Sequence, residues 1–155
     1  MEIYVNSINQ TFSQDGQTSQ IIVTLNGTSN DTSGDYLSSN VSVTSKDLSD
    51  GTNLDTVLDS EIEKLARKKL ETYASGAMPI RVSSVIRNYD QQTHEISSDV
   101  VSLLGNATDG SSDYINYRVT ITKADLPTDK TFDAMSATDL KTLALAKLEA
   151  VTKVA

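Results

Sequence analysis

The sequence predicts an α+β protein built from a β-β-β-α unit that occurs twice in tandem. Three observations lead to this expectation: an internal repeat, stretches in which apolar and polar residues alternate as in strands, and an amphipathic helical pattern at the end of each unit. We expect an antiparallel sheet in each unit, covered by the C-terminal helix of that unit, and a pseudo-twofold arrangement in which the two sheets either join or face each other. The predicted boundaries are residues 1–75 for the first unit, 76–79 for a linker and 80–155 for the second unit, packed together as one compact domain.

The repeat is visible when the two halves are aligned. A constant offset places residues 21–75 on residues 99–153 without a gap, and upstream of the first turn the offset is shorter by one. Two halves rich in Ser, Thr and Asp can match by chance, but matched glycines, tyrosines and apolar positions over a long ungapped stretch favour duplication of one unit. The matched pairs include Ile3 with Ile80, Gly27 with Gly105, Asp35 with Asp113 and Tyr36 with Tyr114.

Each unit starts with three predicted strands. In the first unit, residues 3–7 alternate between apolar and polar side chains, and Gln14-Asp15-Gly16 then provides a turn. Residues 21–25 form a β-branched strand that is expected to stop at Asn26-Gly27, and residues 36–44 alternate again as a third strand. A three-stranded antiparallel meander is the simplest arrangement of these segments.

A helix closes each unit, because apolar residues at three- and four-residue steps define one buried face. Ser60-Glu61-Ile62-Glu63 and Ser136-Ala137-Thr138-Asp139 have the composition of capping boxes at helix starts. Gly76 followed by Pro79 is a typical stop signal for the first helix. The predicted buried faces comprise Leu58, Ile62, Leu65, Ala66, Leu70 and Tyr73 in the first helix, and Leu140, Leu143, Ala144, Leu148 and Val151 in the second.

The composition restricts the function classes. The chain has 13 basic and 21 acidic residues, and its net charge of −8 opposes nonspecific binding to nucleic acid or to an anionic membrane. It has no cysteine, which excludes disulfides and thiolate chemistry, and an aromatic share of 5% disfavours a deep aromatic ligand cleft. No secretory signal peptide and no segment of transmembrane length is recognised, so we expect no membrane insertion. Because of the acidic net charge, we also expect no nucleic-acid binding.

Few residues bear catalytic or metal-binding chemistry. The single histidine, His94, lies in a polar turn, and the usual motifs of serine hydrolases, phosphate-binding loops and zinc proteases do not occur. Asp31 with Asp35, and Asp109 with Asp113, lie four positions apart in equivalent loops, where carboxylates can bind calcium but more commonly form turns. The terminal Glu of a calcium loop is missing, and an enzyme would have to use these same carboxylates. We therefore expect a protein that is not an enzyme, with no catalytic, cofactor-binding or metal-binding residues and no cofactor.

Residues 64–69 form a small basic cluster within the first helix. Acidic residues flank it, and Glu63 and Arg67 are spaced for an i,i+4 ion pair. The cluster is therefore predicted to be a solvated helix face and not a nucleic-acid site.

The chain is acidic, cysteine-free and rich in Ser, Thr, Asn and Asp, and its strand-rich unit ends in Asp59-Ser60-Glu61-Ile62-Glu63-Lys64-Leu65 before it repeats. In these features it resembles small structural proteins of tailed bacteriophages and prophages, particularly tail or baseplate accessory proteins. The resemblance implies a non-enzymatic structural or assembly protein of the virion, or of the host bacterial cytoplasm during assembly, whose partners are itself or other virion proteins. The alternative is a binding module for a cell-surface carbohydrate or protein receptor, which would use residues 28–35 and 106–113 with Tyr36 and Tyr114.

Overall fold

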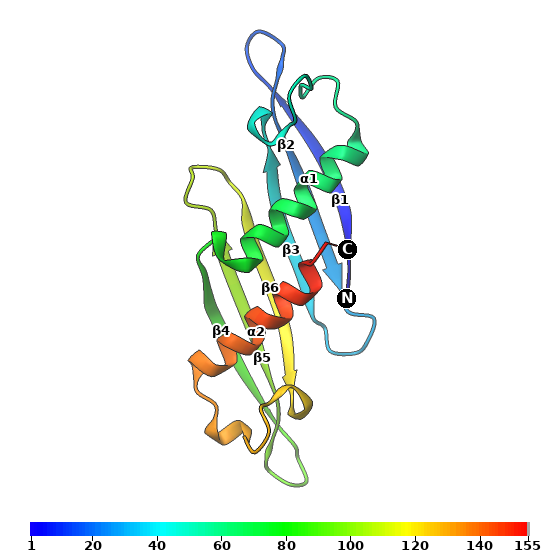
Figure 1. Ribbon diagram of the computed structural model, residues 1–155. Coiled ribbons are helices and arrows are strands. Elements are labelled where there is room, and N and C mark those ends of the chain that lie inside the picture. The colour runs from blue at the N-terminus through cyan, green and yellow to red at the C-terminus, as the bar shows by residue number, and fades with distance from the viewer. Residues whose placement is uncertain (155) are drawn as a thin grey trace.

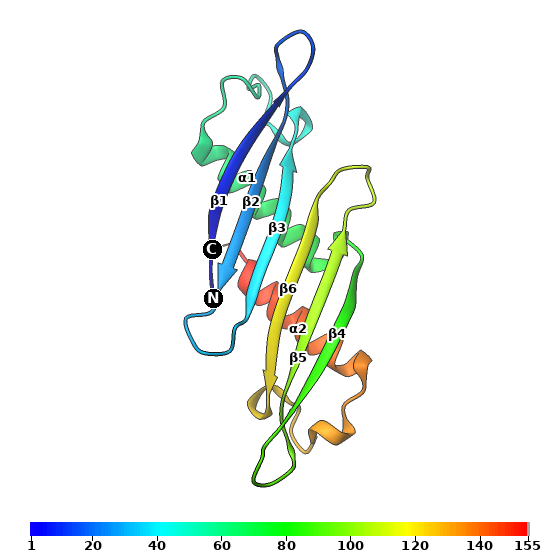
Figure 2. The same cartoon turned by 180° about the vertical axis from the view of Figure 1, so that it is seen from behind.

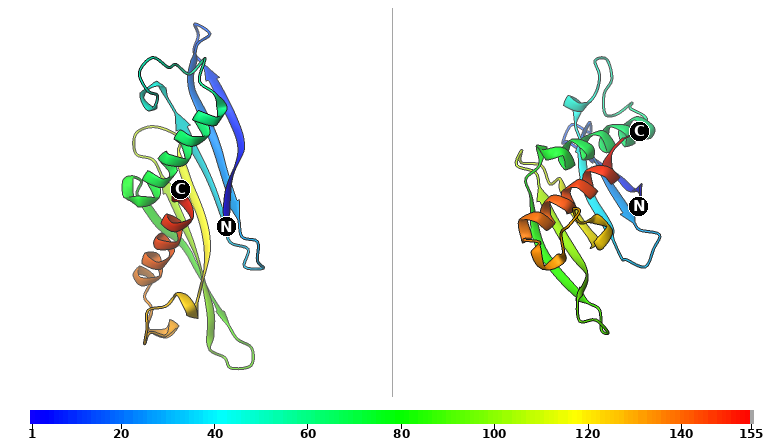
Figure 3. Two further views of the ribbon diagram at one scale, coloured as in Figure 1. Left: turned by 45° about the vertical axis from the view of Figure 1, so that its right-hand side comes forward. Right: turned by 60° about the horizontal axis from the view of Figure 1, so that its bottom comes forward.

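The computed structural model describes residues 1–154, which form one six-stranded antiparallel sheet and two α-helices on the same face of that sheet (Figures 1 and 3). The predicted α+β class is confirmed, and of the two arrangements left open the strands of both units join in one sheet and do not form two sheets that face each other. The strands are β1 (Glu2–Phe12), β2 (Thr18–Thr28), β3 (Tyr36–Val43), β4 (Ile80–Tyr89), β5 (Ile96–Asn106) and β6 (Tyr114–Thr122), and the helices are α1 (Asp59–Thr72) and α2 (Ala137–Thr152).

The strand order is β1-β2-β3-β6-β5-β4, so β3 and β6 lie at the centre while β1 and β4 are the two edges (Figure 2). Each neighbouring pair is antiparallel. The hairpins β1–β2 and β4–β5 extend past the helices at opposite ends of the molecule (Figure 1). The face shown in Figure 2 has no helix over it.

The core lies between the helices and the covered face of the sheet. Alternation along the strands places one set of side chains in this layer, as in the buried row Ile21, Val23 and Leu25 of β2. The matching helix residues are Ile62, Ala66 and Leu70 in α1, and Leu140, Ala144 and Leu148 in α2, all of them buried as predicted.

The start of α1 differs from the prediction. The helix begins at Asp59, so Ser60 lies inside the first turn, and the residue at the N-cap is Leu58, which provides no capping hydrogen bond. Leu58 is 71% exposed and does not belong to the buried face, because it precedes the helix. The second box is confirmed: Ser136 accepts a hydrogen bond from the Asp139 backbone N–H, and Asp139 in turn caps the Ser136 N–H.

Strand β2 also continues past its predicted end, through Gly27 to Thr28. A Cβ at Gly27 would lie 3.1 Å from the Glu2 carbonyl oxygen and 3.1 Å from the Met1 side chain, so the glycine allows β1 to pass closely. Gly105 does the same for Met78 and Ile80, with distances of 2.9 Å. At these two positions glycine indicates close packing and not a turn.

The first helix ends in a wide turn over Tyr73–Ala77, where Gly76 has a φ of 122° that favours glycine. Pro79 then precedes β4, in agreement with the predicted stop signal. Neither α1 nor α2, the two α-helices in residues 1–154, combines the length and apolar character needed to cross a membrane.

Candidate functional site at the centre and edges of the sheet

The two halves of the chain meet along β3 and β6. Five Cα pairs join these strands, with Ser38 opposite Asn116 in the middle. Tyr36 lies opposite Arg118 at one end, and Tyr114 opposite Asn40 at the other. The two tyrosines are half-buried on the open face of the sheet, so they are sheet residues flanking this seam.

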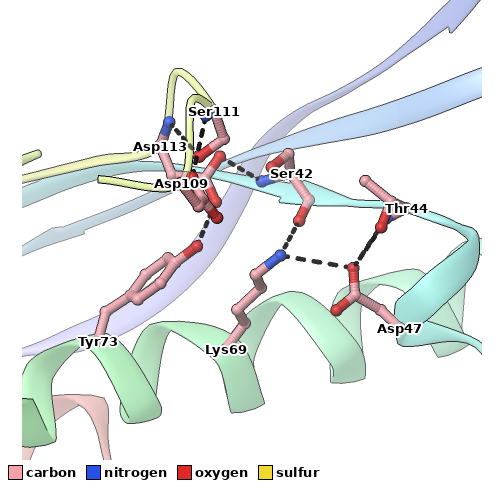
Figure 4. Close-up of polar contacts among 8 residues, drawn as sticks. All are labelled: Ser42, Thr44, Asp47, Lys69, Tyr73, Asp109, Ser111 and Asp113. Atoms are coloured by element: carbon pink, nitrogen blue, oxygen red, sulfur yellow. Dashed lines mark hydrogen bonds and ion pairs between the residues drawn. The ribbon is translucent and has the colours of Figure 1, made fainter. Parts of the chain in front are cut away.

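The two candidate aspartates nearest the seam each reach across it. The Asp35 carboxylate accepts hydrogen bonds from the Thr120 backbone N–H at 2.8 Å and from the Thr120 hydroxyl at 2.6 Å. The Asp113 carboxylate accepts one from the Ser42 backbone N–H at 2.8 Å and one from the Tyr73 hydroxyl at 2.6 Å (Figure 4). Each loop is thereby fastened to a strand of the opposite half.

The other two candidate aspartates serve their own loops. Asp31 accepts from the Ser33 N–H at 2.9 Å, and Asp109 accepts from the Ser111 N–H at 2.9 Å. Hydrogen bonds from Ser33 lower the pKa of Asp31 to about 2, and those from Ser111 lower the pKa of Asp109. Within residues 1–154 no group of three or more His, Cys, Asp and Glu side chains is placed to hold a metal ion.

A second set of polar contacts, made by Lys69 of α1, lies close to Asp113 (Figure 4). Lys69 donates to the Ser42 carbonyl oxygen at 2.8 Å and approaches the Asp47 carboxylate at 3.4 Å. The basic cluster is therefore not wholly a solvated face: Glu63 and Arg67 form the predicted pair at 2.8 Å, but Lys69 is bound to β3. Lys69 lies three residues after Ala66 and four before Tyr73, and this helical spacing from two buried residues is the signal that could have predicted that Lys69 faces the sheet.

Tyr73 is the other functional group whose role the sequence did not reveal. Its ring is buried as predicted, and the hydroxyl at its tip donates to Asp113. Burial raises the pKa of Tyr73, and the hydrogen bond to Asp113 raises it further, so the hydroxyl stays protonated as a donor. A tyrosine on an otherwise aliphatic helix face indicates a buried polar partner.

His94 lies in the turn between β4 and β5 and is exposed, with a left-handed φ of 58°. Its backbone N–H donates to the Asp90 carbonyl oxygen at 2.9 Å. The Asp90 side chain accepts from the Gln92 and Thr93 N–H groups at 2.8 Å each, and these bonds lower the pKa of Asp90. The groups that surround the only histidine thus shape a hairpin turn.

The β4 side of the core holds an unexpected ion pair. Asp99 is fully buried at the position that corresponds to Ile21 in the first half, and neither of its oxygens accepts a hydrogen bond. The Arg87 Nε lies 3.7 Å from Asp99, and an Arg87 NH2 group donates to the Met135 carbonyl oxygen at 3.1 Å. Burial raises the pKa of Asp99, and the Arg87 charge opposes this shift.

The two sheet edges are long and carry exposed apolar side chains. Six large apolar residues are exposed in the described part of the chain, and four of them lie on the edge strands β1 and β4. They are Tyr4 and Phe12 on β1, and Ile86 and Tyr89 on β4. By contrast, the groove beside Met78, Leu145 and Ala146, of about 400 Å³, is open and shallow.

The carboxylates that reach the centre of the sheet are engaged as hydrogen-bond acceptors, and the edges offer backbone groups together with apolar side chains to a neighbouring strand. A comparison of the chain with known protein families, curated proteins and solved structures finds no match.

Proposed function

We propose that the protein is a non-enzymatic structural or assembly component that acts through protein–protein contacts, chiefly with copies of itself. The observation that carries this proposal is the concentration of exposed apolar side chains on both edge strands of a single sheet. Soluble proteins usually protect such edges, since unpaired N–H and C=O groups bind the strands of other chains. Two available edges on one sheet suit repeated association.

We further infer that the chain arose by tandem duplication and has pseudo-twofold symmetry. Contacts that recur at the spacing of the repeat support this, because they use side chains and backbone groups in the same way in both halves. The recurring contacts are Asp35 to Thr120 with Asp113 to Ser42, the capping boxes Thr44–Asp47 and Thr122–Asp125, and the ion pairs Lys69–Asp47 and Lys147–Asp125.

The setting that we propose is the virion of a tailed bacteriophage or prophage, in its tail or baseplate. Support comes from the resemblance in composition and from the edge-rich architecture, which fits rings and stacked layers. In this setting other virion proteins are further partners.

A second candidate function is the binding of a cell-surface carbohydrate or a protein receptor. The observation in its favour is that residues 28–35 and 106–113 are held in fixed loops. The Ser29 N–H donates to the Asp35 carbonyl oxygen, and the Ala107 N–H to the Asp113 carbonyl oxygen, at 3.0 Å each. Saturable glycan binding that is lost on changing Tyr36 or Tyr114 would favour this function.

The experiment that tests the leading proposal is size-exclusion chromatography with light scattering over a wide range of protein concentration, at low and high salt. A defined species above the single-chain mass of 16.7 kDa is expected. The fraction of the protein in this species should increase with salt, because salt screens the repulsion between copies that each carry a net charge of −8. A constant single-chain mass under every condition would contradict self-association.

A further inference from the structure

The edge strands lack most of the features that block strand addition. β1 has 11 residues with one charge, Glu2, and β4 has 10 residues with two charges, Arg81 and Arg87. Neither contains a proline. Arg87 faces the core, where it pairs with Asp99, so one exposed charge remains on each edge.

One protective feature is present on both edges, and it occurs at equivalent positions. β1 has an irregularity between Val5 and Ser7, and β4 has one between Val82 and Ser84. Each places one extra residue, Asn6 or Ser83, against its inner neighbour strand. β2 and β5 accommodate this by setting one residue against two, whereas a regular strand that paired residue by residue with the outer side of either edge would have its side chains on the wrong face beyond the bulge.

The other edge of a second copy does not have this mismatch. Because the six strands alternate in direction, β1 and β4 run antiparallel to each other, and a translated copy brings β4 antiparallel against β1. Val5 can lie opposite Val85 of the next copy, and Ile8 opposite its Val82. Two residues, one of them the extra residue of the bulge, then separate the paired residues on each strand, so the two bulges lie opposite each other and no mismatch arises. All four residues face the helix-covered side and are only partly buried, so the pairing extends the apolar layer.

The same register also matches the open face. It sets Tyr4 opposite Ile86 of the next copy, which pairs two side chains that are 46% and 50% exposed in one chain. Pairing of like edges with opposed bulges would instead place Tyr4 opposite Asn9, and Ile86 opposite Arg81. Aromatic–aliphatic cross-strand pairs are stabilising, whereas these mixed pairs leave apolar surface against polar groups.

We propose that β1 of one copy adds to β4 of another, with Tyr4 opposite Ile86, so that the sheet continues from copy to copy. This inference rests on the proposed assembly function and names its contact. The contact is heterologous and leaves one β1 and one β4 edge free at the ends, so it builds an open chain or closes into a ring.

Cysteine cross-linking tests the register directly, because the natural chain has no cysteine. Tyr4→Cys and Ile86→Cys proteins, mixed under mild oxidation, should form a disulfide-linked pair, since opposite residues on neighbouring strands lie close to disulfide distance. Each variant alone should link much less. Thr24→Cys, on the open face of the inner strand β2, is the matched control and should not link to Ile86→Cys.

A charge exchange gives a second readout in the full chain. Tyr4→Lys or Ile86→Lys alone should raise the concentration needed for assembly about tenfold. Tyr4→Lys with Ile86→Glu should restore assembly, and thermal unfolding confirms that each variant folds. If the natural chain assembles, but the two cysteine variants do not link and neither lysine weakens assembly, this contact is overturned while the assembly function stands. A natural chain that stays a monomer at every concentration would overturn both.

Discussion

Replacing Asp113 by alanine should destabilise the protein more than any other change in the loops. Its carboxylate is 2% exposed and accepts two hydrogen bonds that join the halves, from the Ser42 N–H and the Tyr73 hydroxyl. A hydrogen bond to a charged group contributes ~1.5–3 kcal/mol, and its removal leaves a buried donor unpaired. For two such bonds we expect Asp113→Ala to lower the free energy of unfolding by about 3–5 kcal/mol.

Asp35 provides the matched control because it performs the same task in a more solvated place. Its two donors both belong to Thr120, and water can replace the carboxylate there, so Asp35→Ala should cost ~1–2 kcal/mol. Equilibrium urea unfolding measures both values, and a double-mutant cycle with Tyr73→Phe isolates the hydroxyl bond. A cost for Asp113→Ala no larger than that for Asp35→Ala, or no coupling to Tyr73, would refute the assignment of this buried contact.

Three further outcomes follow from the geometry. Burial raises the pKa of Asp99 in the folded state above its unfolded value, so ionisation of Asp99 removes stability as the pH rises from the unfolded pKa through the folded pKa. Over this pH range the stability advantage of Asp99→Asn over the natural chain should increase with pH. Urea unfolding at several pH values measures it, and a pH-independent difference would contradict this expectation. Lys69→Ala should cost about 1–2 kcal/mol in urea unfolding, while the exposed Lys64→Ala control should lie within ~0.5 kcal/mol of the natural chain. Gly105→Ala should cost about 1–3 kcal/mol through the clash with Met78, and an unchanged melting temperature would contradict that close approach.

The local elements were predictable because their signals are local. Alternation placed the strands, and the three- and four-residue steps placed both helices and most of their buried faces. The errors occur where a distant residue decides. Gly27 has the composition of a strand end, but strand β2 continues through it because the glycine makes room for the Met1 side chain. Leu58 fits the helical spacing, but the helix starts one residue later.

The joining of the strands into one sheet could not be predicted in the same way. Pairing of β3 with β6 brings together residues from opposite halves of the chain, and no turn fixes their register. The burial of Asp99 at a position occupied by isoleucine in the first half was equally hidden, because its ion-pair partner Arg87 lies on another strand and is itself held by the Met135 carbonyl oxygen. Similarly, Asp35 and Asp113 have the composition of turn residues, and only the sheet register gives them donors in the opposite half.

The contacts that do not recur define how the two halves fit together. If the chain arose by duplication, as we propose, its central strands could also pair with their equivalents in another copy. Asp113 obtains both of its donors, Ser42 and Tyr73, from the first half, and the position equivalent to Tyr73 in α2 is Val151, which has no hydroxyl. A β6–β6 pairing would remove the Tyr73 hydroxyl from Asp113 and leave this carboxylate, like Asp35 in the natural arrangement, with donors from Thr120 alone, so one buried hydrogen bond to a charged group would be lost. We infer that this asymmetric contact favours pairing of β3 with β6, and so keeps the edges β1 and β4 as the surfaces available to other chains.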